Sequence, residues 1–173
     1  MSALVKISND IITSSGTHTV TLSGIDSTYN TYMVKFNNVQ PVTDNKNVMI
    51  RLTKGGSIQS DTKYDYVHED LKNNTFAHTA IKGSSAFVIL DSSGNSAGET
   101  NNGILYLFHW ADANEYSWIT YETARMNHTP DMGGRMGGGA HEVASASDGI
   151  VFTTESSVDF ASGAEFTLYG LKK

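Results

Sequence analysis

Hydrophobic residues recur with a period of two over short segments of this chain, and polar turns separate those segments. In residues 16–22 (GTHTVTL), Val20 and Leu22 share one face with His18, while threonines occupy the other. Such alternation is typical of a β-strand with one buried face. The pattern predicts eight or nine strands, over residues 16–22, 32–39, 47–54, 63–68, 86–90, 104–110, 115–124, 149–155 and 164–171.

Two of these segments are apolar on both faces, AFVIL (86–90) and ILYLFHW (104–110). A continuous apolar run is typical of a strand covered on both sides, so we expect residues 104–110 to form a central, fully covered strand. In residues 115–124 the alternation is clear, with Tyr116 and Trp118 opposite Ile119. The two aromatic side chains are therefore expected either both in the core or both at one interface.

Turn residues connect the segments at short intervals, and no long helical pattern exists that could support a βαβ unit. We therefore expect an all-β fold: a single-domain antiparallel β-sandwich over 1–173, jelly-roll-like, with little helix. One short helix is expected over 66–74 (YVHEDLKNN), and Pro41 is expected in a turn between two strands.

A glycine-rich stretch, MNHTPDMGGRMGGGAHE (126–142), interrupts the pattern, and no strand is assigned between 125 and 145. Its spacing matches neither a phosphate-binding P-loop nor a dinucleotide-binding motif. We interpret it mainly as backbone that packs closely against its neighbours. The alternative is an exposed loop that touches a partner. The candidate partner-contact residues are Tyr116, Trp118, Met132, Arg135 and Met136.

Composition excludes several classes of function. The 173-residue chain has a net charge of −6, and its basic residues are scattered, which argues against nucleic acid as a partner. It has no cysteine, so disulfides and thiolate metal sites are excluded. The apolar runs are too short for membrane insertion, and the N-terminal sequence lacks the pattern of a signal peptide.

No motif predicts a reaction. GNSAG (94–98) has the spacing of a nucleophile elbow around Ser96, but a turn and a strand follow it where that motif needs a helix. The six histidines form no metal-binding motif, and the acidic residues have no distinctive spacing. We therefore predict no catalytic residue, no cofactor and no metal, and a protein that is not an enzyme.

Two segments resemble a family. Residues 24–56 (GIDSTYNTYMVKFNNVQPVTDNKNVMIRLTKGG) and 160–173 (FASGAEFTLYGLKK, with Leu168-Tyr169-Gly170) are similar to small structural proteins of tailed bacteriophages, especially marine ones. The segment GILYLFHWAD between them fits the same pattern. The resemblance implies a β-sandwich protein of the virion that acts by packing, and it carries no catalytic residue.

We therefore expect a non-enzymatic virion protein, made in the host cytoplasm and placed on the particle exterior as a capsid decoration or a tail or fibre component. Its expected partners are other virion proteins and further copies of itself, with a trimer favoured. The alternative is a lectin-like module that binds a host-surface glycan through aromatic side chains. A third reading is a jelly-roll metalloenzyme.

Overall fold

The computed structural model describes residues 4–14, 16–73 and 75–172, and these form an antiparallel β-sandwich. The strands are β1 (Leu4–Ile11), β2 (Thr19–Ser23), β3 (Thr31–Val39), β4 (Lys46–Lys54), β5 (Ser57–Ile58), β6 (Tyr64–Lys72), β7 (Phe76–Ser84), β8 (Phe87–Ser93), β9 (Asn101–Phe108), β10 (Ser117–Met126), β11 (Met132–His141), β12 (Gly149–Thr154) and β13 (Glu165–Leu171). One 3-10 turn, η1 (Glu155–Ser157), follows β12. The all-β sandwich expected from the sequence is confirmed.

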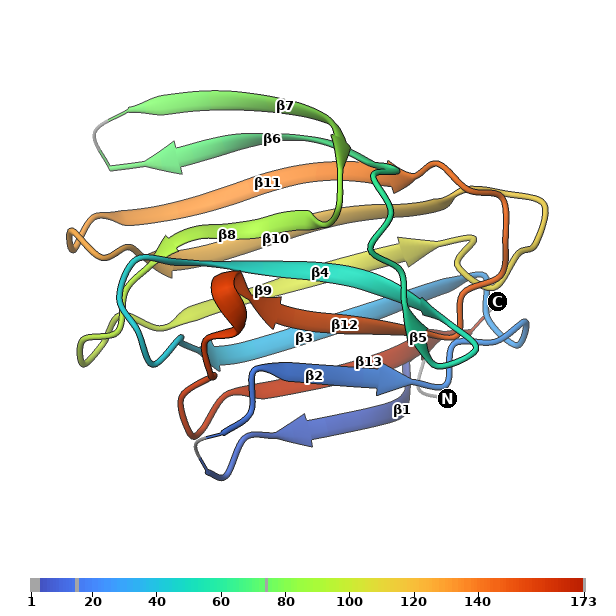
Figure 1. Ribbon diagram of the computed structural model, residues 1–173, viewed down its shortest axis with the longest axis horizontal. Helices are drawn as coiled ribbons and strands as arrows, with labels where there is room; N and C mark the ends of the chain where they lie inside the picture. The colour runs from blue at the N-terminus through green and yellow to red at the C-terminus, as the bar shows by residue number, and fades with distance from the viewer. Residues whose placement is uncertain (1–3, 15, 74, 173) are drawn as a thin grey trace.

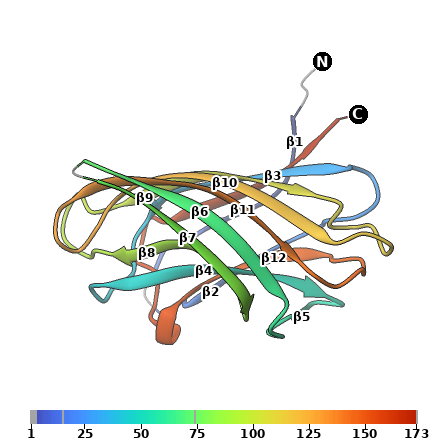
Figure 2. The same cartoon turned by 90° about the horizontal axis from the view of Figure 1, so that it is seen from above.

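The strands form two layers (Figure 1). The larger sheet has the order β1-β13-β3-β9-β10-β11-β6-β7. The smaller sheet contains β2, β12, β4 and β5 in that order, with β8 also paired to β4. Figure 2, turned by 90°, shows the larger sheet lying over the smaller one. The face of the larger sheet that is turned away from the smaller sheet is called the outer face below.

The core fills the space between the layers, and strict alternation places its residues. In β10 the buried residues are Ser117, Ile119, Tyr121, Thr123 and Arg125, and every residue between them is exposed. Because alternate side chains of a strand point to opposite faces, one face of β10 meets the core and the other meets solvent. Among the described residues, no helix is long and apolar enough to cross a membrane.

Nine of the thirteen strands coincide with the segments expected from the sequence, and β1, β5, β7 and β11 are additional. The short helix expected over 66–74 is wrong as far as Lys72, because those residues continue strand β6; residue 74 lies outside the described residues. The buried face of β6 carries His68 and Asp70 after two tyrosines. Because these buried positions are polar, the alternation of hydrophobic and polar residues is lost in the later part of β6.

The expectation that residues 104–110 are covered on both sides is also wrong. Strand β9 is central in the larger sheet, and Leu105 and Leu107 are fully buried. Ile104 and Tyr106 nevertheless point to the outer face, and each side chain is 39% exposed. The apolar character of the second face of β9 therefore reflects an uncovered surface.

Candidate functional site

The glycine-rich stretch forms strand β11, which lies between β10 and β6 (Figure 1). A Cβ added to Gly137 would lie 2.5 Å from the carbonyl oxygen of Val67, and one added to Gly139 would lie 2.4 Å from that of Asp65. Real Cβ atoms do not approach so closely, so neither position can hold a side chain without movement. Close packing of this backbone, the main interpretation from sequence, is confirmed.

Arg135 interrupts the glycines, and it points into the sandwich with 2% of its surface exposed. Its Nε donates a hydrogen bond to Asp70 Oδ1 at 2.8 Å, and its Nη2 donates to Asp70 Oδ2 at 3.2 Å. Its Nη1 donates to the carbonyl oxygen of Val88. The expectation that Arg135 contacts a partner at the surface is therefore corrected: this side chain ties β11 to β6 and β8.

Arg135 belongs to an ionic cluster in which Asp70, Arg125 and Arg135 are buried and Asp91 is partly exposed. Its Nη2 lies 3.0 Å from Asp91 Oδ1, and Arg125 also contacts that carboxylate. His68 lies 3.8 Å from Asp70 on the same strand. Two guanidinium groups thus face two carboxylates, and each charge has a partner of opposite sign, which a buried charge requires. The cluster links β6, β8, β10 and β11, and its position inside the sandwich suits a structural role.

The cluster shifts the pKa values of its members. Burial raises the pKa of Asp70, but the hydrogen bonds and positive charge of Arg135 outweigh burial and leave the pKa below the usual 3.8. Burial, helped by the charge of Arg135, lowers the pKa of His68 below 6.5. Asp70 is therefore ionised and His68 neutral at pH 7.

Residues 24–56 and residues 160–173 meet in the fold. The ring of Tyr29 lies over Gly170, where an added Cβ would come within 2.5 Å of it. Tyr29 also packs edge-on against Tyr32, with 5.7 Å between ring centroids. The hydroxyl of Tyr32 accepts a hydrogen bond from the backbone N–H of Asp26 at 2.8 Å. The tyrosines of the first segment and the glycine of the last therefore fasten the β2–β3 turn to β13.

An apolar patch covers much of the outer face. Eight of the thirteen large apolar side chains that the described residues expose belong to it. The patch consists of Val67, Phe76, Ile104, Tyr106, Tyr116, Trp118, Met132 and Met136. The other five are scattered, so this concentration on one sheet face is the main surface feature of the described chain.

Strand register brings these side chains into rows across the outer face. One row runs from Tyr106 through Thr120 and Gly138 to Val67. The next row runs from Ile104 through Glu122 and Met136 to Glu69, so acidic side chains flank the central methionine. Carboxylates therefore flank the apolar centre of this row, where they can accept hydrogen bonds from a partner.

Missing side chains hollow the outer face along β11. A depression of about 490 Å³ lies over Gly138, between Met136, Val67 and His78. A second, of about 280 Å³, lies on the other side of Met136, against Tyr106. Met136 stands between the two. Glycine residues of β11 line both depressions, so a partner could approach the sheet closely there.

The remaining residues predicted as partner contacts lie on this surface. Trp118 and Met136 are 47% and 48% exposed, and Met132 is 61% exposed at the start of β11. Tyr116 packs against Trp118, with ring centroids 6.5 Å apart and an angle of 39° between the rings. The sequence did not single out Val67, Phe76, Ile104 or Tyr106; the signal that it offered was the apolar outward face of residues 104–110.

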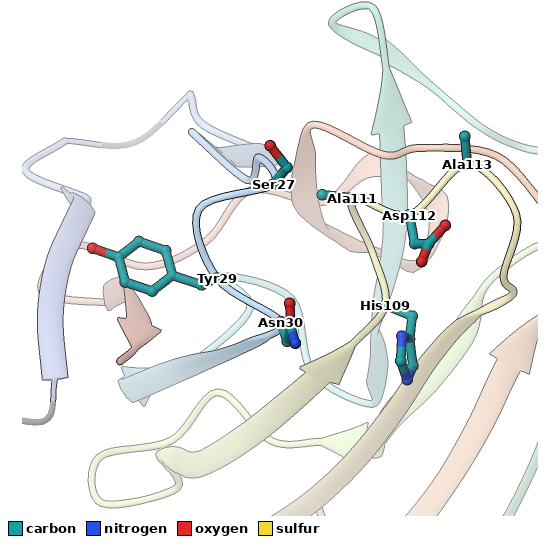
Figure 3. A pocket seen from close by; sticks show the side chains of 7 residues that line it. All are labelled: Ser27, Tyr29, Asn30, His109, Ala111, Asp112 and Ala113. Carbon is teal, nitrogen blue, oxygen red and sulfur yellow. The ribbon is translucent and has the colours of Figure 1, made fainter. Parts of the chain in front are cut away.

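A smaller pocket of about 250 Å³ lies where the β2–β3 and β9–β10 loops meet (Figure 3). Figure 3 shows the side chains of Tyr29 and Asp112 pointing away from each other. Asp112 Oδ1 accepts a hydrogen bond from the backbone N–H of Asn114, and His109 has a positive φ of 61° in the same turn. These groups shape the loop and do not converge on one point.

The motifs considered for catalysis do not form a site. GNSAG lies in the turn between β8 and β9, where the N–H of Ser96 donates to Glu99 Oε2 at 2.8 Å, and a strand follows. Buried His141 contacts Asp61 at 2.9 Å, a carboxylate distant in sequence. Within the described parts of the chain, no three His, Asp or Glu side chains are grouped to hold a metal ion.

Comparisons with known proteins describe the fold alone. No protein-family model and no curated protein matches the chain. Galectin LEC-6 of Caenorhabditis elegans is similar to it at 8% identity and a TM-score of 0.36, over 95% of this chain and 96% of the galectin. Galectin-Ib of Xenopus laevis is similar at 7% identity and a TM-score of 0.34, over 87% and 98% of the two chains. Identities this low transfer no residue role.

Proposed function

We propose that this chain is a non-enzymatic structural protein of a tailed-phage particle. It sits on the particle exterior, as a capsid decoration or a tail component, and packs the outer face of its larger sheet against neighbouring virion proteins. The observation that carries the proposal is the apolar patch on that face. The resemblance of residues 24–56 and 160–173 to phage structural proteins supports the placement in a virion.

The patch has the composition of a contact surface. Met, Trp, Tyr and Phe are enriched at protein interfaces, and methionines adapt their shape to different partners. Gly134 and Gly138 leave the centre of the outer face low, so a partner backbone can come close to the sheet. Burying one such side chain in a partner stabilises the contact by about 1.5–3 kcal/mol before the costs of association.

Met136 is the most informative position because it stands between the two depressions. Replacing Met136 with Lys places a charge in the centre of the contact, whereas Lys at Ile58, exposed to a similar extent on the smaller sheet, leaves the outer face intact. The Met136→Lys variant should fold normally and lose incorporation into particles. The matched Ile58→Lys variant should fold and assemble normally.

The placement is tested by the number of copies per purified particle, measured by quantitative mass spectrometry against the major capsid protein. Hundreds of copies mean a shell decoration, and a few to a few dozen mean a tail or fibre component. A particle that lacks the chain contradicts the proposal.

A second candidate function is binding of a host-surface glycan. The observation that favours it is the exposed aromatic group of Tyr106, Tyr116 and Trp118 at one end of the patch. Aromatic rings can pack against the apolar faces of sugars, and Glu122 lies nearby as a hydrogen-bond acceptor. Saturable binding on a glycan array that Trp118→Ala abolishes and Ile58→Ala preserves would favour this function. No binding would leave packing alone.

A further inference from the structure

Strand β7 forms one edge of the larger sheet and pairs only with β6 (Figure 1). All of its nine residues except Thr79 and Ser84 are exposed. Side chains on both faces of β7 are therefore uncovered, unlike those of the strands that lie over the smaller sheet. An exposed edge of this length is a template for pairing with another strand.

The free backbone groups of this edge follow from the hairpin that joins β6 to β7. The N–H of Lys72 donates to the carbonyl oxygen of Thr75 at 3.0 Å, so these two residues form a hydrogen-bonded pair. Hydrogen-bonded and non-hydrogen-bonded pairs alternate along an antiparallel ladder. Phe76, His78 and Ala80 consequently direct their N–H and C=O groups away from β6, toward the open edge.

The two edges of the larger sheet differ in how they are protected. Strand β1, at the other edge, contains a register shift between Lys6 and Ser8 and carries the charged residues Lys6 and Asp10. Bulges and charges are the usual means of preventing edge pairing. Strand β7 also has a register shift against β6, between Ile81 and Ser84, but this shift and the single lysine, Lys82, lie at the end of the strand. Residues 76–81 form a regular edge, and β7 has no acidic residue. Edge pairing is therefore opposed at β1 and permitted at β7.

We propose that β7 pairs with β7 of a second copy of this chain, antiparallel and about a two-fold axis, so that the larger sheets of two protomers become one continuous sheet. A second copy fits because the strand is complementary to itself in one register. This inference does not depend on the proposed virion function. The pairing would place the two apolar patches side by side on one extended face.

Side chains select the register. With Thr79 of both copies facing each other, Phe76 lies opposite Lys82 and His78 opposite Ala80. Phe76 and Lys82 then share the outer face, where the lysine stem and charge can pack on the ring. Sliding one strand along the other by two residues would place His78 against His78 in one direction, and His78 against Lys82 in the other. Both alternatives bring basic groups together.

The absence of cysteine from the chain permits a direct test. Thr79→Cys places two thiols across the proposed axis, at a non-hydrogen-bonded pair with Cα atoms about 4.5 Å apart, which a disulfide can span. At micromolar protein under mild oxidation, Thr79→Cys should dimerise roughly 1,000-fold faster than Ser57→Cys on the smaller sheet, because paired thiols reach effective concentrations near millimolar. The uncrosslinked wild-type chain should have twice the mass of 18.7 kDa in solution.

Two further cysteine variants locate the contact. Thr120→Cys reports on packing between outer faces, and Ala80→Cys reports on a shifted register. Crosslinking that is fastest at position 120 would overturn edge pairing, and crosslinking that is fastest at position 80 would overturn the register. A single-chain mass, a trimer or an open filament would overturn the two-fold dimer.

A proline variant separates pairing from folding. Ala80→Pro removes an N–H that faces the open edge, so the ladder to β6 remains intact and the monomer should stay folded. Thr79→Pro removes an N–H that the ladder uses and should destabilise the chain. The expected result is a folded monomer for Ala80→Pro, with circular dichroism like that of the wild type. A dimer that survives Ala80→Pro would contradict the proposal.

Discussion

Replacing Gly139 with alanine should destabilise the chain, because the added methyl group has no space. An ideal Cβ at this position lies 2.4 Å from the carbonyl oxygen of Asp65, 2.7 Å from Tyr66 Cβ and 2.8 Å from Phe87 Cε1. Two of these three atoms are backbone or the first carbon of a side chain, so rotation of a side chain cannot relieve the contacts. Strands β11 and β6 must therefore separate locally.

The size of the effect follows from two opposing contributions. Overpacking a core costs about 1–3 kcal/mol, and the contacts at Gly139 place it near the upper end. Alanine also lowers the conformational entropy of the unfolded chain, which stabilises the folded state by about 0.4–1 kcal/mol. The net loss in the free energy of unfolding is about 2 kcal/mol. For a chain of this length, that loss lowers Tm by roughly 4–8 °C.

Gly133→Ala on the same strand provides the matched control. A Cβ there meets the carbonyl oxygen of Leu71 at 3.2 Å, and its next neighbours lie at 3.8 Å. The gain from the unfolded state should nearly cancel this mild crowding and leave Tm close to that of the wild type. Thermal unfolding of both variants, followed by circular dichroism with urea titration for the free energies, makes the comparison.

Equal stability of the Gly139→Ala variant and the wild type would refute the close-packing explanation of the glycines. Equal destabilisation by Gly133→Ala and Gly139→Ala would also refute it, because a general intolerance of alanine in β11 would then be the cause.

Other predictions concern the buried ionisable side chains and the contact between Tyr29 and Gly170. Asp70→Asn should lower the free energy of unfolding by about 3 kcal/mol in urea titration, because it leaves Arg135 with an incomplete set of partners, whereas Glu69→Gln on the exposed face should change it by less than about 0.5 kcal/mol. The free energy of unfolding should fall as pH drops below 6.5, because burial lowers the pKa of His141 in the folded chain. In that pH range the unfolded chain binds more protons than the folded chain. His141→Gln should therefore reduce the slope of the unfolding free energy against pH. Tyr29→Ala should destabilise the chain by about 2–4 kcal/mol, measured by thermal unfolding, because the ring covers Gly170, and Tyr29→Phe should retain most of the wild-type stability.

The sequence predicts most of the fold because alternation is a strong signal wherever the buried face is apolar. Strand β10 shows the signal at its clearest, because Ile119 and Tyr121 lie on one face and Trp118 on the other, as the pattern indicates; the structure adds that the face of Trp118 is the exposed one. The later part of strand β6 shows where it fails, because the pattern there predicts a helix. Its buried face includes Asp70 and His68, and only the partner Arg135, distant in sequence, makes burial of these groups acceptable.

Strands β11 and β7 are invisible to the pattern for different physical reasons. In β11 the glycines carry no side chain, so no alternation can exist, although the backbone ladder forms on both sides. In β7 both faces are exposed, so nothing requires apolar residues on one of them. Arg135 looks like a surface residue among glycines and is buried because Asp70 lies opposite it on β6.

Only half of the residues of the apolar patch could be predicted from the sequence. Tyr116, Trp118, Met132 and Met136 stand out by residue type. They form one patch with Val67 and Phe76 because the strand order of the larger sheet places β6 next to β11 and β7 next to β6. Pairing between strands that are distant in sequence leaves no local signal in the sequence.

Methionine oxidation in purified particles and in the isolated chain tests the proposal that the outer face packs against other virion proteins. Met132 and Met136 are 61% and 48% exposed on the outer face, and partly buried Met49 on the smaller sheet serves as the internal reference. Peptide mass spectrometry after brief peroxide treatment measures the rate of oxidation of each methionine. Assembly should slow oxidation of Met132 and Met136 several-fold relative to Met49. Equal rates in the particle and in the isolated chain would contradict it.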